Sequence, residues 1–151
     1  LVQANFGRRD EFRPFGRPWR SLPAEGGDAK PGEGSIIGIV ATDAPLLPHQ
    51  LQRVARRAAV GMARTGTSGN NGSGDIFLAV STANALPLDA ARGVTALDHL
   101  PNEQLNPVFA GAADAVEEAI LNAIVAAETM VGRDGNRVEG IDREALRALF
   151  A

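Results

Sequence analysis

The chain has 151 residues, of which 44% are hydrophobic and 22% charged, a composition typical of one packed globular domain. Its net charge of −3 argues against nucleic acid or an anionic membrane as the main partner, and no apolar run approaches membrane-spanning length. The absence of cysteine excludes disulfides, thiolate metal sites and a cysteine nucleophile. Two histidines, His49 and His99, leave little for a histidine metal site or for a Ser-His-Asp triad.

The first 34 residues divide into a strand-like start, an arginine-rich middle and a linker. Residues 1–4 have the pattern of a buried strand that the sequence enters midway, which predicts an internal piece of a longer precursor. No signal peptide is visible, and we expect a cytoplasmic protein. The arginines of residues 8–20, with their neighbouring aromatic side chains, fit a solvated surface loop better than a nucleic-acid stacking platform, because the chain is acidic overall. Residues 25–34 are rich in glycine, proline and charge, which predicts a linker.

From residue 35 the hydrophobic pattern indicates a strand, a helix and a second strand in succession. Residues 35–42 form a β-branched run that predicts a buried strand starting at Ser35. Pro48 stands in the first turn of a predicted helix with an apolar stripe along one side. A loop rich in glycine and asparagine, residues 66–74, then leads into a predicted strand at 76–80.

The last third of the chain is predicted to be helical, whereas residues 83–104 carry no clear pattern. Asn106 is the expected N-cap of a long helix with apolar residues at helical spacing as far as residue 127. A turn at 132–136 follows, and Asp142 is expected to cap a short helix that ends at Phe150. This order predicts an α/β fold with layered α and β elements, in which helices pack on one face of a sheet. Two clear strands and a partial one would leave exposed edges, so we expect chain outside this sequence to complete the sheet.

Ser35 is a candidate nucleophile because it stands where the linker meets the strand. A serine hydroxyl needs a base, and a serine at a chain terminus brings its own, since an α-amine with a pKa near 8 is partly neutral at physiological pH. The same hydroxyl can cut the bond before it by attacking the carbonyl of Gly34, where glycine leaves the approach open. The alternative is a linker that merely meets a strand, which is the commoner meaning of a Gly-Ser step.

Ser73 and Asp75 form a second candidate pair at the entry to the 76–80 strand. Two residues apart in an extended segment, they point the same way and can form a relay from the carboxylate through the hydroxyl to Ser35. A solvated turn is the alternative. The segment at 71–73 also matches a glycosylation sequon, which needs a secretory route, and the loop has too few acidic ligands for calcium and no lysine for a phosphate loop.

Asn5 follows the strand-like start and is a candidate donor to an oxyanion, as electrostatic catalysis of acyl transfer requires. Taken alone, an asparagine after a strand is more often a turn residue.

The sequence resembles the L-aminopeptidase/D-esterase family of self-processing hydrolases, which includes the β-peptidyl aminopeptidases. The resemblance rests on five segments: Leu-Val-Gln-Ala-Asn-Phe-Gly at 1–7, Gly-Ser-Ile-Ile at 34–37, Val-Ala-Thr-Asp-Ala-Pro-Leu at 40–46, Asn-Gly-Ser-Gly-Asp-Ile-Phe-Leu-Ala at 71–79, and Ala-Ala-Glu-Thr-Met at 126–130. Such proteins are made as one precursor that cuts itself before the catalytic serine and folds as an αββα sandwich. The resemblance implies that residues 1–34 are the tail of the α chain and residues 35–151 the β chain.

By position, the resemblance implies Ser35 as the nucleophile, Ser73 and Asp75 as the relay, and Asn5 as the oxyanion-hole amide, with the cut between Gly34 and Ser35. It implies release of N-terminal residues from short peptides, amino-acid amides or esters through an acyl-enzyme, without a cofactor. The expected partners are such a substrate, the remaining α-chain portion, and further αβ units in a homo-oligomer. Two alternatives stay open: a related oligoamide hydrolase or acyltransferase, whose known members use threonine as nucleophile, and an inactive homologue with an intact Gly34-Ser35 bond.

Overall fold

A computed structural model describes residues 1–19, 33–86 and 93–151. The predicted linker at 25–34 therefore lies outside the described residues except for its last two positions, as does Arg20 of the arginine-rich segment. In the described part of the chain no helix is long and apolar enough to span a membrane.

The centre of the fold is a small sheet whose long middle strand, β2 (Glu33–Thr42), has neighbours on both sides. Strand β1 (Val2–Asn5) pairs antiparallel with β2, and β4 (Ile76–Ser81) pairs parallel with it on the other side. The two-residue strand β3 (Gly72–Ser73) pairs parallel with the very beginning of β2. The parallel β2–β4 pair is joined through helix α1 (Pro48–Arg64), the connection that parallel strands require.

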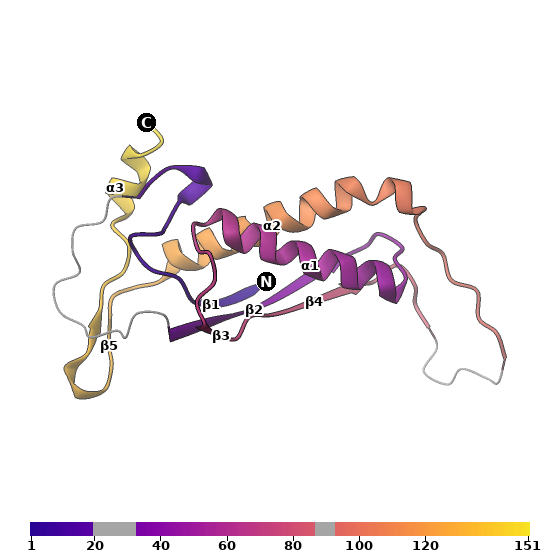
Figure 1. Cartoon of the computed structure of the whole chain (residues 1–151), viewed down its shortest axis with the longest axis horizontal. Helices are drawn as coiled ribbons and strands as arrows, with labels where there is room; N and C mark the ends of the chain where they lie inside the picture. Colours follow the sequence, from indigo (N-terminus) through magenta and orange to yellow (C-terminus); the bar gives the residue numbers. More distant parts are fainter. Residues whose placement is uncertain (20–32, 87–92) are drawn as a thin grey trace.

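The two long helices cover one face of the sheet, as the order of elements predicts (Figure 1). Helix α1 packs against α2 (Asn106–Ala126), and both contact the sheet. The sheet residues that alternate toward the helices include Ile36 and Ala79, which are buried. The two expected strands, the two long helices and their places in the chain are thus confirmed.

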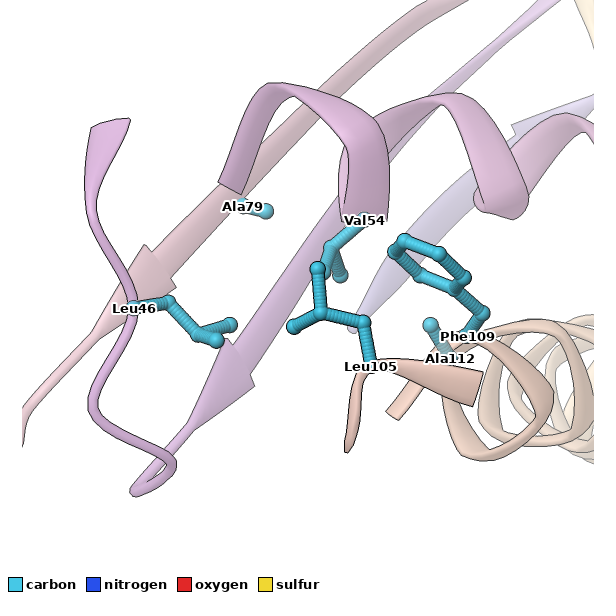
Figure 2. Close-up of a cluster of buried hydrophobic side chains, with 6 residues drawn as sticks. All are labelled: Leu46, Val54, Ala79, Leu105, Phe109 and Ala112. Atoms are coloured by element: carbon cyan, nitrogen blue, oxygen red, sulfur yellow. The ribbon is translucent and has the colours of Figure 1, made fainter. Parts of the chain in front are cut away.

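Two clusters of buried side chains hold the helices to the sheet. In the cluster of Figure 2, Leu46, Val54, Ala79, Leu105, Phe109 and Ala112 meet between α1, β4 and the start of α2. The second cluster centres on Ile36 and Ile120, both fully buried. Full burial of side chains of this size stabilises the fold by about 1.5–3 kcal/mol each.

The opposite face of the sheet is uncovered and apolar. Ile37, Ile76, Leu78 and Val80 point away from the helices and are between 38% and 62% exposed. Antiparallel sheets that face water carry polar residues on that side, whereas sheets buried on both faces are apolar throughout. The side chains of this face are therefore those of a sheet that has a second layer against it.

The C-terminal part of the chain differs in detail from the sequence-based expectation. A two-stranded hairpin, β5 (Met130–Val131) and β6 (Arg137–Val138), encloses the expected turn. Asp142 caps α3 (Arg143–Ala148) as predicted, its carboxylate accepting from the backbone N–H groups of Glu144 and Ala145, although α3 ends before Phe150. Short helical turns lie at Pro14–Gly16, Asn102–Gln104 and Arg133–Gly135.

Asn106 is not the N-cap of α2, and that expectation is wrong. Leu105 occupies the N-cap position, and Asn106 is already the first helical residue. The helical turn Asn102–Gln104 directly precedes Leu105, and the N–H of Leu105 donates to the carbonyl of Asn102, so the chain enters α2 already in a helical conformation and without a side-chain cap.

Candidate functional site

The candidate residues meet at the beginning of β2, where three strands lie side by side. The strand register places Asn5 of β1 directly opposite Ser35, and Gly34 opposite Ser73 of β3. Directly opposed residues of an antiparallel pair have Cα atoms about 4.5–5.5 Å apart. Segments from three distant parts of the chain are thus brought to one end of the sheet.

Ser35 has an exposed side chain, on the side of the sheet that the helices leave uncovered. Its Oγ accepts a hydrogen bond from the backbone N–H of Gly74 at 3.1 Å. A Cβ placed on Gly74 would lie 3.5 Å from the same oxygen, so the backbone of residue 74 directly contacts the hydroxyl. The hydroxyl is held in place and accessible at the same time.

Ser73 and Asp75 are hydrogen-bonded to each other in the same segment. Ser73 Oγ donates to Asp75 Oδ1 at 2.6 Å, a length typical of a hydroxyl bonded to an ionised carboxylate. Both side chains are half-buried. Since Gly74 lies between them and contacts Ser35, the pair stands next to the Ser35 hydroxyl.

The hydrogen bond from Gly74 is a feature that sequence reasoning did not anticipate. We expected Ser73 to be the hydrogen-bond partner of Ser35, but the partner that the structure gives to Ser35 Oγ is the Gly74 N–H. Ser73 instead directs its hydroxyl proton to Asp75. A backbone N–H donor cannot be recognised from the residue type. In the sequence, only the glycine between Ser73 and Asp75 indicates that the backbone could approach another group closely at this point.

Asn5 is exposed at the end of β1, and its side chain alternates to the face opposite that of Ala4 and Phe6, which contact the buried cluster. Asn5 and Ser35 therefore project from neighbouring strands on the side that lacks helices.

Gly34 allows β1 and β2 to approach at this point. Its φ is +155°, a conformation that side chains rarely adopt, and a Cβ would overlap the carbonyl oxygen of Asn5 and lie 3.0 Å from Phe6 Cα. The Gly34-Ser35 bond lies inside β2 and not before it, because β2 already starts at Glu33 through its pairing with β3. The strand therefore starts two residues earlier than Ser35, where we expected it to begin.

The two histidines lie away from this site. His49 stands in the first turn of α1, which begins beyond the far end of β2, and His99 bonds the carbonyl of its neighbour Leu100. Neither is arranged to take a proton from Ser35. Among residues 1–19, 33–86 and 93–151, no three His, Asp or Glu side chains are grouped to hold a metal ion.

Comparisons with known proteins agree on one group of enzymes. The sequence profile of peptidase family S58 matches residues 1–138. The beta-peptidyl aminopeptidases BapA of Sphingosinicella microcystinivorans and Sphingosinicella xenopeptidilytica are 44% and 40% identical to this chain. Both alignments cover 99% of this chain, but only 42% and 41% of the two relatives. The chain thus spans less than half the length of these curated relatives.

Solved structures give the same grouping at the level of the fold. The L-aminopeptidase D-Ala-esterase/amidase of Ochrobactrum anthropi, described as a prototype for the serine aminopeptidases and a variant of the Ntn hydrolase fold, superposes with a TM-score of 0.84 at 42% identity. The PH0078 protein of Pyrococcus horikoshii OT3 gives 0.86 at 40% identity. Each comparison covers 99% of this chain and 41% of the other. The expected fold class is confirmed, and the chain belongs to peptidase family S58.

Proposed function

We propose that this chain carries the catalytic residues of a self-cleaving aminopeptidase, with Ser35 as the nucleophile. The observation that carries the proposal is the grouping at the start of β2: a fixed, exposed Ser35 hydroxyl beside the Ser73–Asp75 hydrogen bond, with Asn5 opposite. The names of the relatives support the same activity, since two are β-peptidyl aminopeptidases and one is an L-aminopeptidase with D-Ala-esterase/amidase activity.

In the first step, Ser35 Oγ attacks the carbonyl carbon of Gly34. The C–N bond of the peptide breaks, the hydroxyl proton passes to the departing nitrogen, and the acyl group moves to oxygen. Water then hydrolyses this ester, leaving a Gly34 carboxylate and a Ser35 that carries both a free hydroxyl and a free α-amine. Glycine at position 34 supports this assignment, because it lacks the Cβ that would overlap the carbonyl oxygen of Asn5 and leaves the approach to its own carbonyl carbon open.

In the second step, the freed α-amine takes the proton of the Ser35 hydroxyl as it attacks a substrate carbonyl. The Asn5 amide is the donor to the oxyanion that forms, while the Gly74 N–H holds Ser35 Oγ. Asp75 orients Ser73, whose hydroxyl can in turn orient the new amine. When the intermediate collapses, the substrate's C–N or C–O bond breaks, the departing amine or alcohol takes the proton from the Ser35 amine, and the acyl group stays on Ser35 Oγ. Water then hydrolyses this ester, which releases the substrate's N-terminal residue as a free acid and restores the Ser35 hydroxyl.

The cut divides the chain into residues 1–34, the tail of an α chain, and residues 35–151, the β chain. The uncovered apolar face with Ile37, Ile76 and Leu78 supports a second sheet packed against this one, as in an αββα sandwich. That layer would come from the α-chain portion outside this sequence. Since Ser35 points to the same side, the substrate would bind between the two sheets, with short peptides, amino-acid amides or esters as the substrate class.

The test is intact-mass analysis of the full-length protein combined with an aminopeptidase assay. We expect two chains, the smaller beginning at Ser35, with release of ammonia from amino-acid amides and of the N-terminal residue from β-peptides. Ser35→Ala should remain one chain and be inactive. Ser68→Ala is the matched control, since Ser68 is an exposed serine of the nearby loop, and it should be cut and active.

Two outcomes would overturn the proposal. Cleavage of Ser35→Ala at the same bond would exclude Ser35 as the agent of the cut. An intact wild-type chain without turnover of any of these substrates would indicate an inactive homologue.

A further inference from the structure

A cavity of about 300 Å³ lies on the helix side of the sheet, between the segment that follows β1, the end of α2 and the segment that follows β6. Its volume is at the lower end of the range of small-molecule sites. Of the four proposed catalytic residues, only Asn5 also lines it; Ser35, Ser73 and Asp75 do not. The cavity thus borders the site at the start of β2 at Asn5 but does not include the proposed nucleophile or the Ser73–Asp75 pair.

One part of the cavity wall is aromatic and aliphatic. Phe6, Phe12, Trp19 and Ile124 line it, and the rings of Phe12 and Trp19 meet edge to face with centroids 6.4 Å apart. Such a wall binds an apolar body, and the faces of aromatic rings also attract organic cations.

Two carboxylates of the wall lack a cationic partner among the described residues. Oε2 of Glu11 is buried and has no hydrogen-bond partner, and neither Glu11 nor Glu128 belongs to an ion pair of the described chain. A buried carboxylate oxygen without a donor is costly. Because the last torsion of a glutamate is broad, a small rotation presents this oxygen to a bound donor.

Of the other charged side chains of the wall, Arg8 and Glu139 are already in ion pairs. Arg8 pairs with Asp10 at 3.1 Å, and Glu139 is bonded by Arg137 and by Thr129. Arg9 donates to the backbone carbonyl of Glu139. Arg9 has no carboxylate partner among the described residues, so this one cation stands against the two carboxylates of Glu11 and Glu128 and leaves the wall with one excess negative charge, beside the aromatic side chains.

We infer that this cavity binds a primary ammonium group carried on a short apolar body. Glu11 is the main hydrogen-bond acceptor for the ammonium, Glu128 adds attraction from the rim, and Phe12 and Trp19 contact the apolar part. The inference does not depend on catalysis at Ser35.

The probe is phenethylamine, with phenethyl alcohol and phenylacetate as its neutral and anionic counterparts. Trp19 is the one tryptophan of these 151 residues, so full-length protein labelled with 5-fluorotryptophan reports the cavity by ¹⁹F NMR, with the resonance assigned through Trp19→Phe. We expect a saturable shift with phenethylamine and at least about tenfold weaker binding of the other two compounds, as loss of a charge-assisted hydrogen bond predicts.

Glu11→Gln should weaken phenethylamine binding by about tenfold while leaving the thermal unfolding midpoint within a few degrees of wild type. Glu118→Gln is the matched control, because Glu118 is an exposed carboxylate of helix α2 that does not line the cavity, and it should bind like wild type. Ser35→Ala should also bind like wild type, which separates this site from the proposed catalytic one.

Three results would overturn the inference: no saturable shift of the Trp19 resonance, equal binding of the amine and the alcohol, or unchanged binding in Glu11→Gln. A shift that disappears in Ser35→Ala would also overturn it, since binding would then belong to the catalytic site. If aminopeptidase activity is absent but the Trp19 shift persists, the proposed function fails and the amine site stands.

Discussion

Gly34→Ala tests whether the close approach of β1 to β2 positions the candidate site. The substitution adds a side chain at a φ of +155°, at a cost of about 1–3 kcal/mol. The new Cβ would also overlap the carbonyl oxygen of Asn5, and such crowding costs about another 1–3 kcal/mol. Against a typical total stability of about 5–15 kcal/mol, a loss of about 2–6 kcal/mol is a large share.

Two other glycines separate these effects. Gly69 has a φ of +78° and nothing within 4 Å of an added Cβ, so Gly69→Ala should lose only the conformational part, about 1–2 kcal/mol. Gly111, inside α2, has neither a positive φ nor a neighbour in reach, and Gly111→Ala should gain about 0.5–1 kcal/mol.

The assay is urea unfolding in a Ser35→Ala background, in which every variant is expected to be one uncut chain. With a slope of about 2 kcal/mol per molar urea, the unfolding midpoint of Gly34→Ala should fall by about 1 M or more. In the background that retains Ser35, the same substitution should slow the appearance of the two chains. A midpoint for Gly34→Ala no lower than that of Gly69→Ala would refute the crowding argument.

Three further substitutions test the relay, the core and the hairpin. Asp75→Asn replaces the charged acceptor of the Ser73 hydroxyl and should lower kcat for an amino-acid amide by about 10²-fold, measured by steady-state kinetics with the fold verified by circular dichroism. Ile120→Ala empties a fully buried position and should cost about 2–5 kcal/mol in urea unfolding. Arg137→Ala should raise the pKa of Glu139, now held below its usual range chiefly by the hydrogen bond from Arg137, as followed by carboxyl NMR titration. Because the folded pKa is the lowered one, the Arg137–Glu139 contact stabilises the hairpin above the unfolded pKa of Glu139 and is lost as the pH falls through the folded pKa.

Each of these substitutions has a control at an exposed position. Asp43→Asn should leave kcat unchanged, Val60→Ala should cost less than about 0.5 kcal/mol, and Arg133→Ala should leave the pKa of Glu139 where it is. A wild-type kcat in Asp75→Asn would remove Asp75 from the relay. Equal losses for Ile120→Ala and Val60→Ala would contradict the burial assigned to Ile120.

The sequence predicted those features of the fold that depend on local patterns. The β-branched run after residue 35 and the apolar stripe after Pro48 follow from strand and helix periodicity, and both elements are present where expected. The hairpin of β5 and β6 was missed because strands of two residues are too short to show an alternating pattern, and Met130, Val131 and Val138 are exposed. The N-cap of α2 is Leu105 and not Asn106, because a preference for asparagine at N-caps takes no account of the helical turn that precedes α2.

The candidate site shows the same division between local and long-range information. Ser73 and Asp75 are two residues apart, so their hydrogen bond follows from extended geometry alone. Contacts across the fold gave no such signal. The Gly74 N–H that bonds Ser35 spans 39 residues, and the crowding at Gly34 comes from the backbone of β1. Backbone N–H and C=O groups do not differ between residue types in a way that reveals their partners. Strand register decides which of these groups meet.

The position of Ser35 in the sheet also bears on how a freed α-amine would behave. New chain termini usually fray, and a frayed amine would rarely be aligned with its own hydroxyl. Here β2 is the middle strand: β1 pairs with it from Ser35 onward, β4 pairs with its continuation from Ile37, and Gly74 holds the Ser35 hydroxyl. A break before Ser35 would leave all of these contacts intact, and contacts such as the backbone bond from Arg13 to Thr65 would keep the preceding segment attached. The amine produced by the cut would therefore arise in a fixed position beside the hydroxyl, so that little of the orientation needed for proton transfer would have to be gained on substrate binding.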